Sequence, residues 1–169
     1  MRRLSVRAGL VLAAVVSLLG APSAASAAPI NDFHDVTING WVHIKDDERH
    51  HDDIDNYDMH VETLRLLDTV PKQWAAWSWC QGDEVYVELH MDASRIADRP
   101  GWVKINAKAD LYEMWDCPND DHDGTASMSF EVPPNTSVNK MLRVDNHEKG
   151  SEDYAEIHFT VASYFTKTG

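Results

Sequence analysis

Apolar and polar residues alternate along most of this chain, and no long stretch repeats with the 3.6-residue period of a helix. The clearest alternating segments are residues 36–44, 85–91, 103–111, 126–132 and 155–161, with a weaker one at 138–144. Strands with one apolar and one polar face are typical of antiparallel sheets that bury a single face. The alternation therefore predicts an all-β domain, an antiparallel β-sandwich of about eight strands.

Two segments decide the strand count and the direction of the chain. Residues 57–66 change phase near Glu62 and Thr63, which predicts a β-bulge. Residues 73–79 fit either a short helix or a strand, but the turn-like residues 81–84 that follow favour a strand.

With this eighth strand, successive connections alternate between the two ends of the sandwich. Connections 46–57, 81–84, 114–124 and 145–153 then share one end, whereas 68–72, 93–101 and 133–136 share the other. A helix at 73–79 would instead move the first connection to the opposite end.

Residues 1–27 have the features of an export signal. Arg2, Arg3 and Arg7 precede an apolar run at 8–20, and the small residues up to Ala27 form a cleavage site. The later sequence contains no run of about 20 apolar residues, as a membrane-spanning helix requires. We therefore expect cleavage near Ala27, secretion, and one β-sandwich domain over residues 28–169.

The mature chain is strongly acidic. Removing residues 1–27 takes away three arginines and no acids, leaving 12 Lys and Arg against 28 Asp and Glu, a formal charge of −16. This charge argues against nucleic acid and anionic lipid as electrostatic partners. Metal ions, cationic proteins and neutral ligands remain open, and the expected partner is an extracellular protein or a glycan.

The chain has two cysteines, Cys80 and Cys117. An oxidising extracellular compartment favours one disulfide between them, and the eight-strand order places both at the same end. Closing this loop would stabilise the fold by about 4 kcal/mol in the chain-entropy model. A catalytic thiol pair is disfavoured, because the two cysteines are far apart and lack a CxxC spacing.

Residues 46–58 hold seven carboxylates within thirteen positions. Such a cluster repels itself unless a cation screens it, and clusters of oxygen ligands suit calcium best. Counting Asp58, the four connections expected at this end hold 17 of the 28 acids. We therefore predict a calcium site at the acidic end.

The segment Asn119–Gly124 strengthens this prediction. Oxygen ligands at its first, third and fifth positions, followed by glycine at the sixth, match the opening of a calcium-binding turn. The twelfth position is Phe130 instead of the glutamate of a helix-loop-helix site, so the remaining ligands must come from another loop or from water. A polar turn between strands is the alternative interpretation.

Paired aspartates at a strand end, a second aspartate pair and an Asp-rich loop before the last strand resemble synaptotagmin-type calcium-dependent lipid-binding domains. This resemblance implies eight antiparallel strands with calcium between loops at one end, and calcium binding instead of membrane docking for so acidic a chain. The matching positions are Asp47 and Asp53 in the first loop and Asp145 and Asp153 in the last. With the 119–124 segment, the predicted ligands are Asp47, Asp53, Asp121, Asp123, Asp145 and Asp153. In style, the short export-tagged chain also resembles uncharacterised secreted proteins of actinobacteria, which implies no activity.

Histidine and tryptophan suggest two further ligands. Zinc is disfavoured, because the chain has no HxxxH or HxH pair to begin a tetrahedral site. The six tryptophans could pack in the core or form a carbohydrate platform. Trp41 and Trp102 are the better platform candidates, since we expect them to be partly exposed and the 74–79 group to be mainly buried.

Catalysis has little support in the sequence. There is no serine elbow, Gly-rich phosphate loop or HExxH motif. Paired carboxylates could serve glycoside hydrolysis, but any acid-rich loop offers such pairs. The sequence thus predicts a secreted, non-catalytic binding or structural module with calcium at one end. The alternatives are a carbohydrate- or protein-binding module without metal, and a secreted hydrolase or inhibitor.

Overall fold

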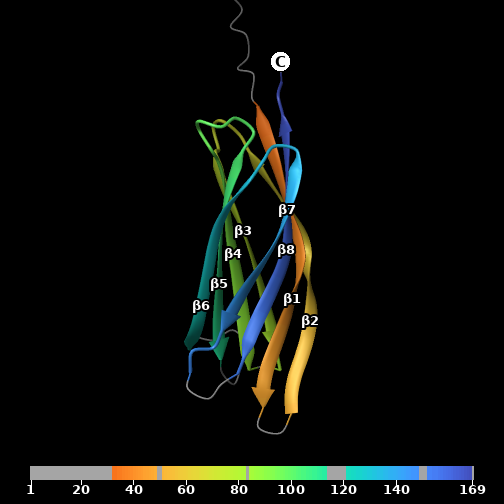
Figure 1. Cartoon of the computed structure of the whole chain (residues 1–169), viewed down its shortest axis with the longest axis vertical. Helices are drawn as coiled ribbons and strands as arrows, with labels where there is room; N and C mark the ends of the chain where they lie inside the picture. Colours follow the sequence, from red (N-terminus) through yellow and green to blue (C-terminus); the bar gives the residue numbers. More distant parts are fainter. Residues whose placement is uncertain (1–31, 49–50, 83, 114–120, 149–151, 169) are drawn as a thin grey trace, which may run out of the picture.

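The computed structural model describes residues 32–48, 51–82, 84–113, 121–148 and 152–168. These residues form eight strands in two four-stranded antiparallel sheets that pack face to face (Figure 1). The predicted all-β antiparallel sandwich is confirmed. Among the described residues, no helix is long and apolar enough to cross a membrane.

Each sheet is built from strands that pair antiparallel with their neighbours. Sheet A has the order β2-β1-β8-β7, with β1 at Phe33–Glu48, β2 at His51–Leu66, β7 at Thr136–Asp145 and β8 at Tyr154–Thr166. Sheet B has the order β3-β4-β5-β6, with β3 at Lys72–Gln81, β4 at Val85–Arg95, β5 at Val103–Glu113 and β6 at His122–Val132.

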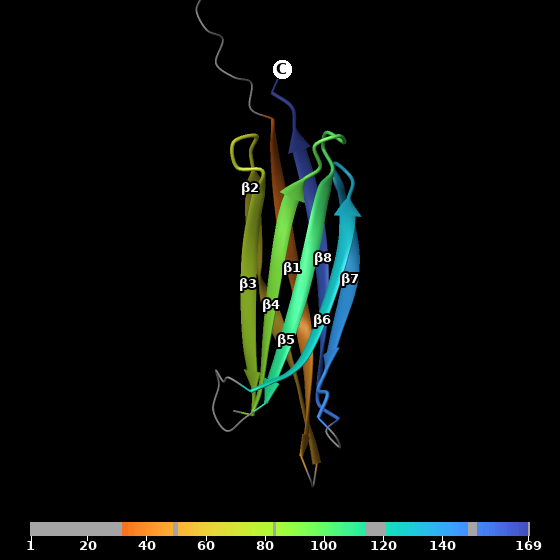
Figure 2. The same ribbon diagram turned by 90° about the vertical axis from the view of Figure 1, so that its left-hand side faces the viewer.

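The connections alternate between the two ends of the sandwich, as predicted. Strands β1, β3, β5 and β7 finish at one end, here called the acidic end, and β2, β4 and β6 finish at the opposite end, where the C-terminus lies (Figures 1 and 2). Residues 73–79 are part of strand β3 and not a helix, which is why all four acid-bearing connections share one end.

The core lies between the sheets and consists of the inward residues of the alternating segments. Ile38 and Ile44 from sheet A and Leu89, Ile105 and Leu111 from sheet B are fully buried. Burying each such side chain contributes about 1.5–3 kcal/mol. The core therefore determines which face of every strand points outward at either end.

The acidic segment differs from its prediction as a loop. The β1–β2 pairing continues through it, with Asp46 opposite Asp53 and Asp47 opposite Asp52. Aspartate is rare in strands, so its density suggests a loop, but the backbone pairs across this hairpin, and the side chains of Ile54 and Asp55 are exposed. Further along β2, the register shifts at residues 60–61, opposite Asn39 of β1, close to the bulge predicted at 62–63.

A buried histidine lies near the opposite end of the sandwich. His34 is 1% exposed and packs against the Phe165 ring, and neither of its ring nitrogens has a hydrogen-bond partner among the described residues. Burial, assisted by the positive charge of Arg95, holds the pKa of His34 below its ordinary value. The imidazole is therefore neutral at physiological pH, and its unsatisfied nitrogens cost folding free energy.

Replacing this histidine by an apolar residue is expected to stabilise the protein. His34→Leu should raise the free energy of unfolding by about 1 kcal/mol at pH 7.5, because it removes buried polar atoms without partners. The gain should grow as the pH falls below about 6.5, since only the unfolded wild-type histidine then gains a proton readily. Urea unfolding at pH 7.5 and 5.5 measures both effects, with the exposed His60→Leu as control. Destabilisation at both pH values would contradict this account.

Candidate functional site

Carboxylates from different connections meet inside the acidic end. Glu113 is the last residue of β5, Asp123 is the second residue of β6, and Asn146 and Asp153 flank the β7–β8 connection. We call these four residues the carboxyl cluster. Asn146 Nδ2 donates to Glu113 Oε2 at 2.6 Å and lies 3.5 Å from Asp153 Oδ2, so one amide links two of the three acids.

A register shift turns Asp123 toward this cluster. Leu111 pairs with Gly124 but Tyr112 pairs with His122, so Asp123 is an extra residue on β6. Such bulges re-aim side chains. The buried Asp123 carboxylate accepts the Glu113 backbone N–H at 2.7 Å, which places these two acids side by side.

Gly124 allows β6 to approach the end of β7. A Cβ atom on Gly124 would lie 2.2 Å from the backbone oxygen of Asp145, which no side chain tolerates. In the same region the His147 backbone N–H donates to the Asp123 carbonyl oxygen at 2.9 Å. Gly124 therefore serves a close contact between the sheets, whereas the calcium-turn pattern predicts that it makes a sharp turn.

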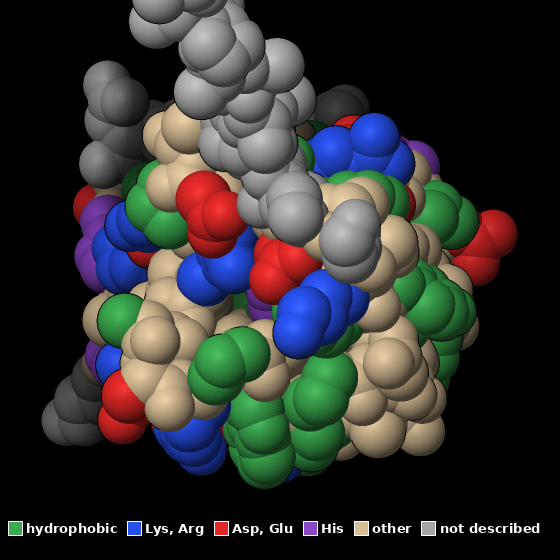
Figure 3. Space-filling model, turned by 90° about the horizontal axis from the view of Figure 1, so that it is seen from above, with side chains coloured by type: hydrophobic (Ala, Val, Ile, Leu, Met, Phe, Trp, Pro, Cys, Tyr) green, Lys and Arg blue, Asp and Glu red, His purple; other side chains and the backbone are tan. Residues whose placement is uncertain are grey.

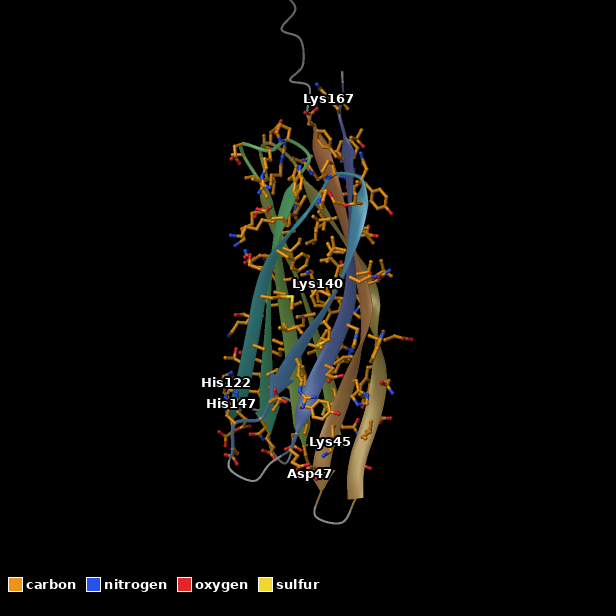
Figure 4. All side chains as sticks on the ribbon, in the orientation of Figure 1. Lys45, Asp47, His122, Lys140, His147 and Lys167 are labelled. Carbon is orange, nitrogen blue, oxygen red and sulfur yellow. The ribbon has the colours of Figure 1, made fainter. Side chains whose placement is uncertain are left out.

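Strand β1 completes the acidic end from the sheet A side. The Asp47 backbone N–H donates to Asp153 Oδ1 at 2.5 Å, and Asp153 is 3% exposed. Lys45 Nζ lies 3.3 Å from Glu152 Oε2 and 3.8 Å from Asp47 Oδ1. Lys45 and Asp47 mark this side in Figure 4, where His122 and His147 lie at the same end. The fold thus supplies a buried cation, Lys45, at the acidic end.

The two ends differ in their charge balance. At the opposite end, Lys and Arg side chains lie among Asp and Glu side chains (Figure 3), and Arg95 pairs with Asp68 and Arg99 with Glu131. At the acidic end, burial and the negative charges of Asp153 and Asp123 raise the pKa of Glu113 to about 7, although the Asn146 hydrogen bond opposes this. The crowded carboxylates are therefore costly to ionise together.

Neutralising Glu113 is expected to stabilise the metal-free protein at high pH. Its folded pKa of about 7 exceeds the ordinary 4.5, so the wild type loses stability as the pH rises between these values. Glu113→Gln should be more stable than the wild type by about 1–2 kcal/mol at pH 8, after allowance for a side chain that is only half-buried, and equally stable near pH 4.

Urea unfolding in chelator at pH 4 and pH 8 measures this difference. The control is Glu148→Gln, which makes the same charge change at an exposed position of the same end. A Glu113→Gln gain that is the same at both pH values would show that Glu113 ionisation is not the cause.

The predicted calcium ligands lie in different surroundings. Asp123 and Asp153 belong to the carboxyl cluster. Asp47 contributes its N–H to Asp153, while its carboxylate faces Lys45. Asp53 is half-buried in the β1–β2 hairpin, opposite Asp46.

The other two predicted ligands are exposed. The backbone oxygen of Asp121 accepts the Glu113 N–H at 3.3 Å, and the Asp145 carboxylate is bonded by Arg143 at 2.7 Å. The described side chains contain no group of three or more His, Cys, Asp or Glu arranged to hold a metal ion. The ligand roles thus stay predictions.

Sequence reasoning missed Glu113, Asn146 and the buried Asp46. All three continue the inward phase of their strands beyond the last apolar residue, as Asp153 does at the start of β8. A polar residue at a position where the alternation points inward is the sequence signal that predicts such a buried polar side chain.

The structure describes one of the two cysteines of the predicted disulfide. Cys80 lies near the acidic end of β3, where the Tyr57 hydroxyl donates to its carbonyl oxygen at 3.1 Å. Cys117 lies outside the described residues, so the pairing of the two stays a prediction.

The tryptophan predictions are correct except at one position. Trp41 is 41% exposed and Trp102 is partly exposed, whereas Trp77 and Trp79 are buried. Trp74, expected to be buried with them, is 63% exposed. Alternation along β3 turns Trp74 outward because Ala75, Trp77 and Trp79 face the core.

Comparison with known proteins gives no functional assignment for this chain. No protein-family model and no curated protein matches the sequence.

Proposed function

We propose that this protein is a secreted, non-catalytic binding or structural module that binds calcium at its acidic end. The observation that carries the proposal is the convergence of Glu113, Asp123 and Asp153 from three strand ends. A divalent cation would offset their mutual repulsion and make the folded acidic end more stable.

The donor chemistry of the cluster suits calcium. Carboxylate and amide oxygens are the ligands that calcium prefers, and sites in extracellular modules commonly have Kd values of about 10⁻⁴–10⁻³ M. The carboxylates of Asp123 and Asp153 each accept a backbone N–H group through one oxygen, which holds them at the acidic end. Ligands from two connections at one end also agree with the resemblance to synaptotagmin-type sandwiches.

Native mass spectrometry of residues 28–169, with calcium and after chelation, tests the proposal. We expect calcium-bound species that chelator removes and that Asp153→Asn or Asp123→Asn greatly reduces. Asp53→Asn tests the hairpin as a further ligand source. The matched control is Asp98→Asn, an exposed acid at the opposite end, which should bind as the wild type does. Equal calcium loading of the cluster variants and the control would refute this site.

A further inference from the structure

The outer face of sheet B contains a groove that the acidic end does not use. One hollow of ≈330 Å³ is lined by Ala76 and Ser78, the next, of ≈600 Å³, by Asn106, Ser127 and Ser129, and His90 lines both. The two hollows adjoin at His90, and we call them together the sheet B groove. It runs across the sheet that Figure 2 shows in front, from β3 at one edge to β6 at the other.

Strand register explains the shape of the groove. Ala76, His90, Lys108 and Ser127 form one outward row across the four strands. The short side chains of Ala76 and Ser127 lie on the two edge strands of this row, so the surface is low there. The second hollow offers the amide of Asn106, the amino group of Lys108 and the hydroxyl of Ser127 beside apolar surface.

Trp74 forms an aromatic wall beside this row. Its side chain is 63% exposed, and its ring stacks on the His90 imidazole with centroids 5.3 Å apart and planes 22° from parallel. The stacking fixes the position of the indole beside His90, which lines both hollows, while much of the indole surface stays open to solvent. A fixed, exposed indole is a suitable surface for the apolar face of a ligand.

Most charges on this face pair with one another, and Glu88, which lines the first hollow, accepts the Tyr86 hydroxyl at 2.9 Å. Lys72 Nζ lies 3.0 Å from Asp92, Lys108 Nζ lies 2.8 Å from Asp110, and His122 also contacts Asp110 at 3.0 Å. In a chain with a mature charge of −16, this local balance favours an uncharged ligand. Hydrogen-bonding groups beside an aromatic surface match a molecule that has both hydroxyl groups and apolar patches.

We infer that the sheet B groove binds a neutral polysaccharide, with one sugar ring stacked on Trp74 and sugar hydroxyl groups bonded to Asn106, Lys108 and Ser127. This inference rests on the proposed function as a binding module and names its ligand class. It differs from the expected platform, since Trp41 lies on sheet A and the Arg99 guanidinium covers Trp102 at 4.8 Å.

Affinity electrophoresis of residues 28–169 in gels containing neutral β-glucan, xylan or mannan, with pull-down on cellulose and chitin, tests the inference. We expect at least one neutral polysaccharide to retain the protein and acidic alginate not to. Trp74→Ala should weaken binding at least tenfold, as loss of an aromatic anchor usually does.

Trp41→Ala is the matched control and should bind as the wild type does. Trp41 is also exposed and stacks on a histidine, His158, at 4.0 Å and 9°, but on the other sheet. If Trp74→Ala failed to fold, Ser127→Arg would replace it, because the longer side chain fills the groove from its opposite edge. Retention by none of the neutral polysaccharides, wild-type binding by the groove variant, or loss of binding in Trp41→Ala would each overturn the inference.

Calcium loading separates this inference from the proposed metal site. Trp74→Ala should load calcium as the wild type does, because Trp74 lies far along β3 from the acidic end. A wild-type protein that binds polysaccharide but loads no calcium would support the groove and refute the metal site. A protein that loads calcium but binds no polysaccharide would support the metal site and refute the groove.

Discussion

Calcium at about 100 times its Kd is expected to raise the free energy of unfolding by about 2.7 kcal/mol, because it binds only the folded acidic end. For a domain of this size, the gain corresponds to a rise in Tm of roughly 10 °C. With a Kd in the range of extracellular modules, tens of millimolar calcium approach this limit. Magnesium should stabilise less, because it demands a tighter octahedral shell.

Thermal unfolding in calcium, in magnesium and in chelator, at matched ionic strength, measures this effect. Asp153→Asn should lose most of the calcium response, while Asp98→Asn should keep it. Superimposable wild-type curves in calcium and chelator would mean that the acidic end is a solvated surface and not a metal site.

The substitution Gly124→Ala is expected to lower the free energy of unfolding by about 3 kcal/mol or more. The new Cβ would lie 2.2 Å from the Asp145 carbonyl oxygen and 3.1 Å from its carbonyl carbon, so backbone must move. Overpacking costs about 1–3 kcal/mol where side chains can adjust, and a clash with backbone lies at or above the upper end of that range.

Equilibrium unfolding in urea measures the effect, with Ser137→Ala on the exposed face of β7 as control. The displacement should also disturb Asp123, the neighbouring residue in the carboxyl cluster, and so weaken calcium loading. A Gly124→Ala protein that is as stable as the wild type would show that β6 and β7 do not need this approach.

The sequence determined the class of fold and the direction of each strand. Alternation identifies the strands because one face of each must leave water. Eight successive antiparallel strands have seven connections, four at one end and three at the other. The same alternation predicts which way two residues of the carboxyl cluster point. Glu113 and Asp153 lie on the inward phases of β5 and β8, so their burial could be predicted from position alone.

Only the tertiary structure decided the remaining features of the site. The 46–58 segment reads as a loop because aspartate is rare in strands, but its backbone pairs across the hairpin. Asp123 lies on the outward phase of β6, and a register shift against β5 turns it inward. Trp74, Trp77 and Trp79 offer apolar side chains on both faces of β3, so packing against the core chose which face is buried. These features depend on pairing between residues distant in sequence, whereas alternation is a property of each strand by itself.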